Sequence, residues 1–279
     1  MSSGYFSPQI IPGGTRIACR VEYDGSAYNG WQSQSGGNVT TVQDALQSAL
    51  AAVAGTSVRL HCAGRTDTGV HAHAQFVHFD APAPRSSKAW VVGGNANLPE
   101  DIRLHWARAV PAEFHARHSA RSRLYRYVVS NTPVRPALLR DKVTWHRPEL
   151  NAADMHEAAQ ALVGEQDFSA FRAASCQSAS PMRNVHRVAV SRRRDLVVVE
   201  IEANAFLHHM VRNIAGTLLA IGEGRAPVAW LRELLRAGDR TLSAETAPAR
   251  GLYLADVGYP HEFGLPATPP GPIFAVGDP

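Results

Sequence analysis

The chain has 279 residues, of which 45% are hydrophobic and 19% are charged, and these proportions are ordinary for a folded globular protein. Its length allows one large domain or two domains of moderate size. No apolar run is long enough to span a membrane, and residues 1–14 lack the apolar core of a signal peptide, so we expect neither feature. The net charge of +4, in which arginine greatly outnumbers lysine, permits a polyanionic partner without establishing one.

The three cysteines, Cys19, Cys62 and Cys176, lie far apart in the sequence. An odd number of cysteines argues against a disulfide framework, and no paired spacing indicates a zinc site. A reducing cytoplasm is therefore the simplest setting for this chain.

The first half of the chain alternates between strand and helix patterns. Residues 1–14 carry no pattern and are predicted to form a flexible tail. Apolar residues alternate over residues 16–23, which predicts a half-buried strand. Thr41, with Asp44 three positions later, predicts a capped helix that ends at Gly55. The other elements predicted in this half are a strand into Cys62, a strand up to Asp80, a helix near residues 87–92 and a strand over residues 102–109.

The second half repeats this mixture of strands and helices. Its patterns predict strands at 123–129, 185–190, 196–201 and 251–257, and helices at 154–163, 206–221 and 228–237. We therefore predict an α+β fold of two ferredoxin-like or RRM-like halves, with mainly antiparallel sheets. The predicted halves are residues 15–112 and 113–260, and the Pro/Gly-rich residues 261–279 are predicted to be a second flexible tail.

The most unusual stretch is residues 64–72, Gly-Arg-Thr-Asp-Thr-Gly-Val-His-Ala, which lies between two predicted strands. Two glycines bracket one carboxylate, Asp67, and Arg65 lies two positions before it. A rigid scaffold commonly presents reactive side chains on such loops, which favours a functional carboxylate. A hairpin turn in which Asp67 bonds its own backbone is the alternative.

Three other features also have two interpretations each. The aromatic residues of the loop at 23–32 could stack on bases or pack into the core from its edge. Tyr125, in the run Arg-Leu-Tyr-Arg-Tyr, shares a strand face with Arg123 and Tyr127, which suits base stacking or ordinary packing at the sheet margin. Arg212 borders the apolar stripe of a predicted helix, with His208 one turn earlier, and could serve a substrate, a structural salt bridge or solvent contact.

The histidines do not indicate a metal site. His71 and His73 would point to the same side of a strand, but a third ligand at suitable spacing is missing. The chain also has neither a Walker loop nor the glycine-rich fingerprint of dinucleotide-binding proteins.

Taken together, these stretches resemble the TruA-type tRNA pseudouridine synthases. The resemblance covers residues 15–260, and the motif at 64–72 is its most specific part. The other matching stretches are residues 23–32, 41–43, 97–102, 114–117, 123–127, 167–172, 210–212 and 251–254.

The resemblance implies a cytoplasmic enzyme that isomerises uridine to pseudouridine in the anticodon arm of tRNA, at positions 38, 39 and 40. It implies a homodimer without a metal or an organic cofactor, and an active-site cleft between the two halves. The family's catalytic aspartate falls on Asp67, its base-stacking tyrosine on Tyr125 and its active-site arginine on Arg212. Arg65 matches the arginine associated with RNA binding and base extrusion. A non-catalytic RNA-binding module and a nucleosidase that releases free uracil are the alternatives.

Overall fold

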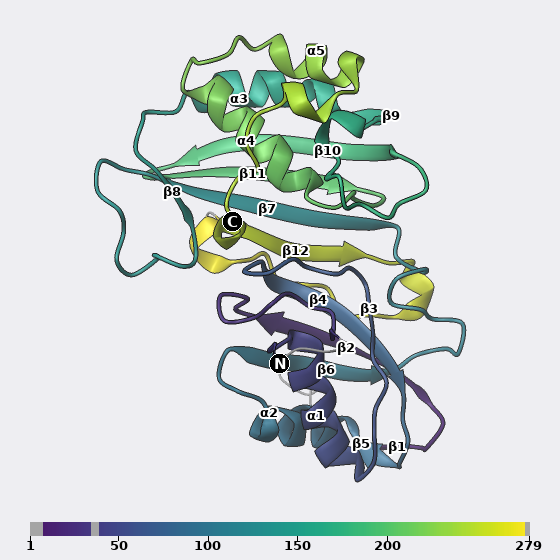
Figure 1. Ribbon diagram of the computed structural model, residues 1–279. Coiled ribbons are helices and arrows are strands. Elements are labelled where there is room, and N and C mark those ends of the chain that lie inside the picture. The colour runs from purple at the N-terminus through teal and green to yellow at the C-terminus, as the bar shows by residue number, and fades with distance from the viewer. Residues whose placement is uncertain (1–7, 35–38, 277–279) are drawn as a thin grey trace. The chain divides into compact units, whose positions relative to one another are not determined.

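The computed structural model describes residues 8–34 and 39–276, and the chain divides into two compact units (Figure 1). Unit 1 comprises residues 1–121 and 254–269, and unit 2 comprises residues 122–253 and 270–279. The chain thus returns to unit 1 after it has built most of unit 2. Both units combine helices with mainly antiparallel strands, which confirms the predicted α+β class at that level.

Unit 1 is built on a sheet in which β6, β2, β4 and β12 follow one another, with β3 also paired to β4. The pairings of β2 with β4, of β2 with β6 and of β3 with β4 are all antiparallel. The elements of this unit are β1 (Ile10–Ile11), β2 (Arg16–Tyr23), α1 (Val42–Ala54), β3 (His61–Cys62), β4 (His71–Asp80), β5 (Arg85–Ser86), α2 (Gly94–Asn97), β6 (Ile102–Ala109) and most of β12 (Leu252–Gly258).

Both faces of this sheet are covered, so the predicted half-buried strand at 16–23 has the right bounds but the wrong burial. On β4, Phe79 packs edge-to-face on Trp90 of the helical segment before α2, with ring centroids 5.1 Å apart. On the opposite face, the ring centroid of Phe76 lies 5.5 Å from that of Trp106 and 5.2 Å from that of Tyr259. The alternation at 16–23 suggests one-sided burial, but Ala18 and Arg20, at 0% and 5% exposure, are buried on the second face as well.

Helix α1 confirms the prediction made from its two ends. The Thr41 hydroxyl accepts a hydrogen bond from the Asp44 amide at 3.3 Å, and Gly55 takes the left-handed conformation, with φ 75°, that ends the helix. The helix predicted near 87–92 is instead a π-helical segment, Ala89–Gly93, which continues into α2.

Unit 2 contains a sheet in the order β7, β11, β10, β9, with all three neighbouring pairs antiparallel, and β8 pairs with β7 in parallel. Helices α3, α4 and α5 lie together over one face of this sheet (Figure 1). The elements are β7 (Ser122–Asn131), β8 (Thr144–His146), α3 (Ala152–Ala159), β9 (Gly164–Asp167), β10 (Met182–Arg193), β11 (Leu196–Ala203), α4 (Met210–Gly222) and α5 (Trp230–Ala237).

Helix α4 differs from its prediction in two ways. It begins at Met210 rather than at Phe206, because His209 takes the left-handed conformation with φ 61° and interrupts the helical path. His208 therefore does not lie one helical turn before Arg212. The helix is also buried on nearly every side rather than along one stripe, because it packs between the sheet and the helices around it, and Arg212 is its only residue that is not buried.

The two predicted tails contain short ordered contacts within the described residues. Ile11 on β1 is buried, and β1 pairs with β5. In unit 1 the ring of Phe263 lies 5.1 Å from that of Phe114, and in unit 2 Ala275 joins the core beside Val128. Residues 1–7 and 277–279 lie outside the described residues, and the flexibility of the tails stays a prediction.

None of the helices within residues 8–34 and 39–276 combines the length and the apolar character that crossing a membrane requires.

Candidate functional site

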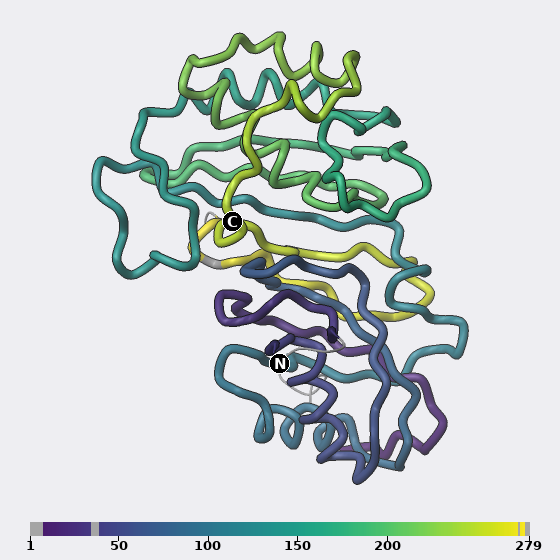
Figure 2. The backbone as a smooth tube through the Cα atoms, viewed as in Figure 1, coloured from purple at the N-terminus to yellow at the C-terminus, as the bar shows by residue number. Residues whose placement is uncertain are grey.

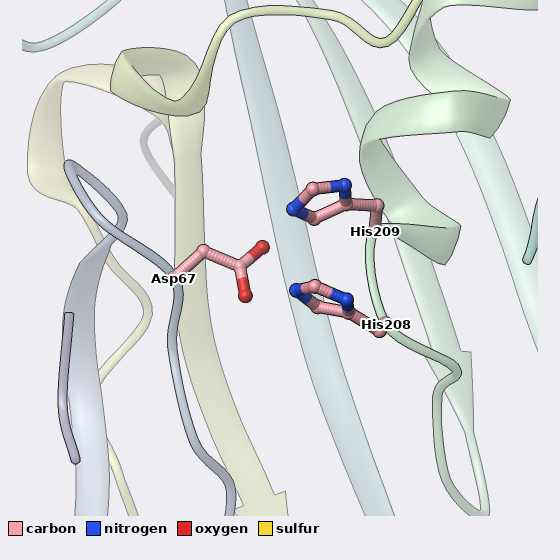
Figure 3. Close-up of side chains that lie close together, drawn as sticks. All are labelled: Asp67, His208 and His209. Atoms are coloured by element: carbon pink, nitrogen blue, oxygen red, sulfur yellow. The ribbon is translucent and has the colours of Figure 1, made fainter. Parts of the chain in front are cut away.

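Asp67 lies on the loop that connects β3 to β4 in unit 1, as the sequence predicts. The loop turns back at Gly69, whose φ is 77°, and the Val70 amide donates to the Asp67 carbonyl oxygen at 3.1 Å. The Asp67 carboxylate extends away from the backbone of this loop and is half-buried (Figure 3). Arg65, two positions earlier, is exposed. One loop thus carries a partly sheltered carboxylate and a solvent-exposed guanidinium.

The aromatic loop after β2 packs inside unit 1 and holds the Asp67 loop. Tyr28 and Trp31 are at most 5% exposed, so their packing interpretation is confirmed. The Trp31 amide donates to the carbonyl oxygen of Thr66 at 3.0 Å, on the residue directly before Asp67. Gly30, with φ 87°, permits this approach, because a Cβ there would lie 2.7 Å from the same oxygen.

Two buried polar side chains also fix the Asp67 loop. The hydroxyls of Tyr23 and Thr66 lie 2.7 Å apart and form a hydrogen bond. Gln75, on β4, is fully buried and uses both ends of its amide on the start of the loop. Its Nε2 donates to the Gly64 carbonyl oxygen at 2.6 Å, and its Oε1 accepts from the Ala63 amide at 3.2 Å. Buried hydrogen bonds of this kind hold a loop in one conformation because an unmade bond is costly.

Tyr125 projects from β7 in unit 2 and is 8% exposed. Its ring packs edge-to-face on Phe206, with centroids 5.0 Å apart. Arg126 points to the opposite face, as the strand alternation predicts. There its guanidinium forms an ion pair with Glu200 at 2.7 Å. The packing of Tyr125 is therefore established, and its use as a stacking surface stays a prediction.

Arg212 lies in the first turn of α4, and its side chain is half-buried. Its Nε donates to the carbonyl oxygen of Ala247 at 2.8 Å, while the Ala247 amide donates to the Arg212 carbonyl oxygen at 3.1 Å. A guanidinium held through Nε has a fixed plane, which is what directional contact with an anion or a base requires.

His208 and His209 precede α4, and their rings lie 4.0 Å apart (Figure 3). The His208 amide donates to the Cys176 sulfur at 3.4 Å, and its Nδ1 lies 3.0 Å from the Ser175 hydroxyl. These contacts tie the start of α4 to the loop before β10.

The predicted site residues thus fall into two groups. Asp67 and Arg65 share one loop of unit 1, whereas Tyr125 and Arg212 belong to β7 and α4 of unit 2. That all four act on one substrate stays a prediction from the sequence. The sequence interpretation missed the supporting residues Gln75, Thr66 and Ala247. Gln75 gave no clear signal, because β4 also contains His71, His73, His78 and Asp80.

Comparison with known proteins identifies the family. The family model described as tRNA pseudouridine synthase matches residues 20–119 and 158–260. A protein of Legionella pneumophila (strain Lens) named tRNA pseudouridine synthase A is 55% identical over 259 residues, which cover 93% of this chain and 98% of that protein. A protein of the same name from Histophilus somni (strain 129Pt) is 53% identical over 264 residues, covering 95% and 97%.

A solved chain from a Cbf5-Nop10-Gar1 complex is 10% identical and aligns with a TM-score of 0.32 over 85% of this chain and 57% of that one, a likeness too low to carry an argument. The family match spans parts of both units and includes the loop of Asp67 and the helix of Arg212, whereas the strand of Tyr125 lies between the two matched ranges. The chain therefore belongs to the tRNA pseudouridine synthase family.

Proposed function

We propose that this chain isomerises uridine to pseudouridine in the anticodon arm of tRNA, at positions 38, 39 and 40. Family membership supports the reaction and the tRNA substrate. The observation that carries the proposal is the loop of Asp67, because the most specific motif of the sequence forms a braced connection between two strands and presents one carboxylate.

The reaction rearranges one nucleotide without an external reactant. The bond between N1 of uracil and C1′ of ribose breaks, the detached uracil turns, and a bond from C5 to C1′ forms. The hydrogen on C5 leaves as a proton and N1 gains one, so that the atoms and the electrons balance. A base paired or stacked in the RNA is inaccessible, and the target nucleotide must therefore be flipped out before the reaction.

Each predicted site residue has one role in this proposal. Asp67 in its ionised form is the catalytic group, whether it attacks C1′, attacks C6 or removes a proton from the ribose. The guanidinium of Arg212 stabilises negative charge at the reacting nucleotide. Tyr125 offers a flat apolar face to the uracil and excludes water from the sugar. Arg65 contacts the RNA and assists base extrusion.

We further propose that each unit is a ferredoxin-like half, and that one uridine binds in a cleft between them, since Asp67 and Arg212 must reach the same nucleotide. The antiparallel pairing of β6, β2, β4 and β3 in unit 1 supports this architecture. The same proposal includes a homodimer in the cytoplasm that needs no metal or organic cofactor, as the family resemblance implies.

Tritium release from tRNA labelled at C5 of uridine tests the function. Purified protein should release tritium to water while the nucleoside stays in the chain, and mapping should place the product at positions 38 to 40. Labelled free uracil would indicate a nucleosidase instead. Binding of tRNA without tritium release would indicate a non-catalytic RNA-binding module.

A further inference from the structure

Residues 246–248 cross α4 at Arg212, on the path from α5 to β12 (Figure 2). At the centre of this segment, Ala247 exchanges two hydrogen bonds with Arg212, one to its backbone carbonyl and one from its Nε. The orientation of the guanidinium therefore depends on where Ala247 lies.

Thr246 anchors one side of Ala247 to the interior of α4. Its hydroxyl donates to Oδ1 of Asn213 at 2.7 Å, and Asn213 is fully buried. The Nδ2 of Asn213 donates to the Phe171 carbonyl oxygen at 2.8 Å, which fixes the amide so that its oxygen faces Thr246. Arg240 reinforces this contact, because its Nη2 lies 3.1 Å from Asn213 Oδ1 and 3.0 Å from the Thr246 hydroxyl.

Tyr127 anchors the other side of Ala247. Its hydroxyl donates to the Pro248 carbonyl oxygen at 2.9 Å and lies 2.6 Å from the hydroxyl of Thr144. Burial raises the pKa of Tyr127 well above its usual value, so the hydroxyl remains protonated and available as a donor. Three consecutive residues are thus held by four side chains of unit 2, those of Asn213, Arg240, Arg212 and Tyr127.

The segment also packs directly on the helix. A Cβ at Gly216 would lie 2.0 Å from the carbonyl oxygen of Glu245, so the backbone of the segment comes as close to α4 as a glycine allows. The position of the segment is therefore determined both by hydrogen bonds and by contact.

We propose that residues 246–248 orient the Arg212 guanidinium for the reaction, and that Thr246 and Asn213 are positioning residues that act through it. The inference rests on the proposed function. A guanidinium must match the group it binds in angle as well as in distance. Small displacements of catalytic groups from the substrate slow a reaction strongly. Neither residues 246–248 nor Asn213 needs to touch the substrate.

Thr246→Val removes the anchoring hydroxyl but keeps the shape of the side chain. We expect single-turnover conversion of tRNA to slow by about ten-fold or more, with the tRNA dissociation constant within about two-fold of wild type. Thr246→Ser restores the hydroxyl and should restore the rate. Thr241→Val is the matched control, because Thr241 is exposed and its hydroxyl bonds Asp239 at 2.7 Å.

Two further measurements separate positioning from general stability. In an Arg212→Lys background, Thr246→Val should add little to the loss, since both changes act through one group. The Arg212 Nε–H signal in nitrogen-15 spectra should exchange slowly with water in wild type and rapidly in Thr246→Val.

A wild-type rate for Thr246→Val overturns the inference. So does a loss shared by Thr246→Ser or Thr241→Val, a loss fully additive with Arg212→Lys, or an unchanged Nε–H exchange rate. Failure of the wild-type protein to convert tRNA at all would instead overturn the proposed function, so the two failures are distinguishable.

Discussion

Gln75 Nε2 donates a 2.6 Å hydrogen bond to the carbonyl oxygen of Gly64, the first residue of the loop that carries Asp67. Its Oε1 accepts from the amide of Gly64 at 3.3 Å and from that of Ala63 at 3.2 Å. Just after β3 ends, the Gln75 side chain thus provides backbone hydrogen bonds of the kind that a neighbouring strand would make. This buried amide couples the rigidity of the sheet to the position of the carboxylate.

Gln75→Met should destabilise unit 1, because it keeps the approximate volume but removes the partner of the partly buried amide and carbonyl oxygen of Gly64, whereas the Ala63 amide keeps the Phe76 carbonyl oxygen. We expect a loss of about 1–3 kcal/mol in the free energy of unfolding, measured by urea denaturation. Gln177→Met, at an exposed position, should change that free energy by less than about 0.5 kcal/mol. Equal stability of the two variants would show that the Gln75 hydrogen bonds contribute nothing.

A stack of histidines in unit 1 predicts that stability depends on pH. Burial, together with the neighbouring rings of His115 and His61, lowers the pKa of His78 to about 3 from 6.5, whereas Asp80 opposes and Arg16 reinforces the shift. The unfolded chain therefore binds a proton at His78 that the folded chain refuses between these two pH values. The resulting stability is fully present above pH 6.5 and is lost as the pH falls toward 3.

His78→Asn should flatten this part of the pH profile of the free energy of unfolding, because it removes the titrating imidazole. The fold should be kept, since the asparagine oxygen can accept the hydrogen bond that the Ala116 amide now donates to His78 Nδ1 at 3.1 Å. His186→Asn, at an exposed position, should leave the profile as it is in wild type. A profile with the same slope in His78→Asn would assign the pH dependence to other groups.

Local sequence signals predicted the elements whose causes are local. The Thr41 cap and the Gly55 terminus of α1 depend on neighbours within a turn, and both were found. The glycine-bracketed loop of Asp67 was likewise predicted between two strands. The left-handed His209 at the start of α4 was not predicted, because a non-glycine residue with positive φ carries no reliable pattern.

The supporting contacts of the site could not be predicted, because their partners are far apart in the sequence. Tyr127 meets Pro248 across 121 positions, and Tyr23 meets Thr66 across 43. Pairings of this kind result from the folded topology and not from periodicity. The site residues themselves were predicted through the family resemblance, which names residues without showing what holds them.

Tyr125 tests whether an aromatic face takes part in the reaction. Tyr125→Phe keeps the ring and its edge-to-face contact with Phe206, so tRNA binding and most of the folding stability should remain. Tyr125→Ala removes about 1–3 kcal/mol of stacking and should weaken tRNA binding further than Tyr125→Phe does. The dissociation constants of the two variants give the comparison, and equal losses would argue against stacking.

Arg212→Lys tests whether the forked shape of the guanidinium is needed in addition to its charge. A lysine cannot reproduce the planar donor set or the Nε bond to Ala247, so conversion of tRNA should slow by more than about ten-fold. Arg193→Lys, at the exposed last residue of β10, is the matched control and should convert tRNA at the wild-type rate. Full activity of Arg212→Lys would show that a positive charge at position 212 is sufficient and that the guanidinium shape is not needed.

We propose that an ionised Asp67 performs the isomerisation. Asp67→Asn keeps the shape of the side chain and removes its charge, and Asp195→Asn makes the same change in an exposed turn. The decisive measurement is pseudouridine formed in tRNA under single-turnover conditions, with tRNA binding measured on the same samples. We expect Asp67→Asn to bind tRNA and to form no pseudouridine, while Asp195→Asn matches wild type. Pseudouridine formation by Asp67→Asn at the wild-type rate would show that the charge of Asp67 is not required.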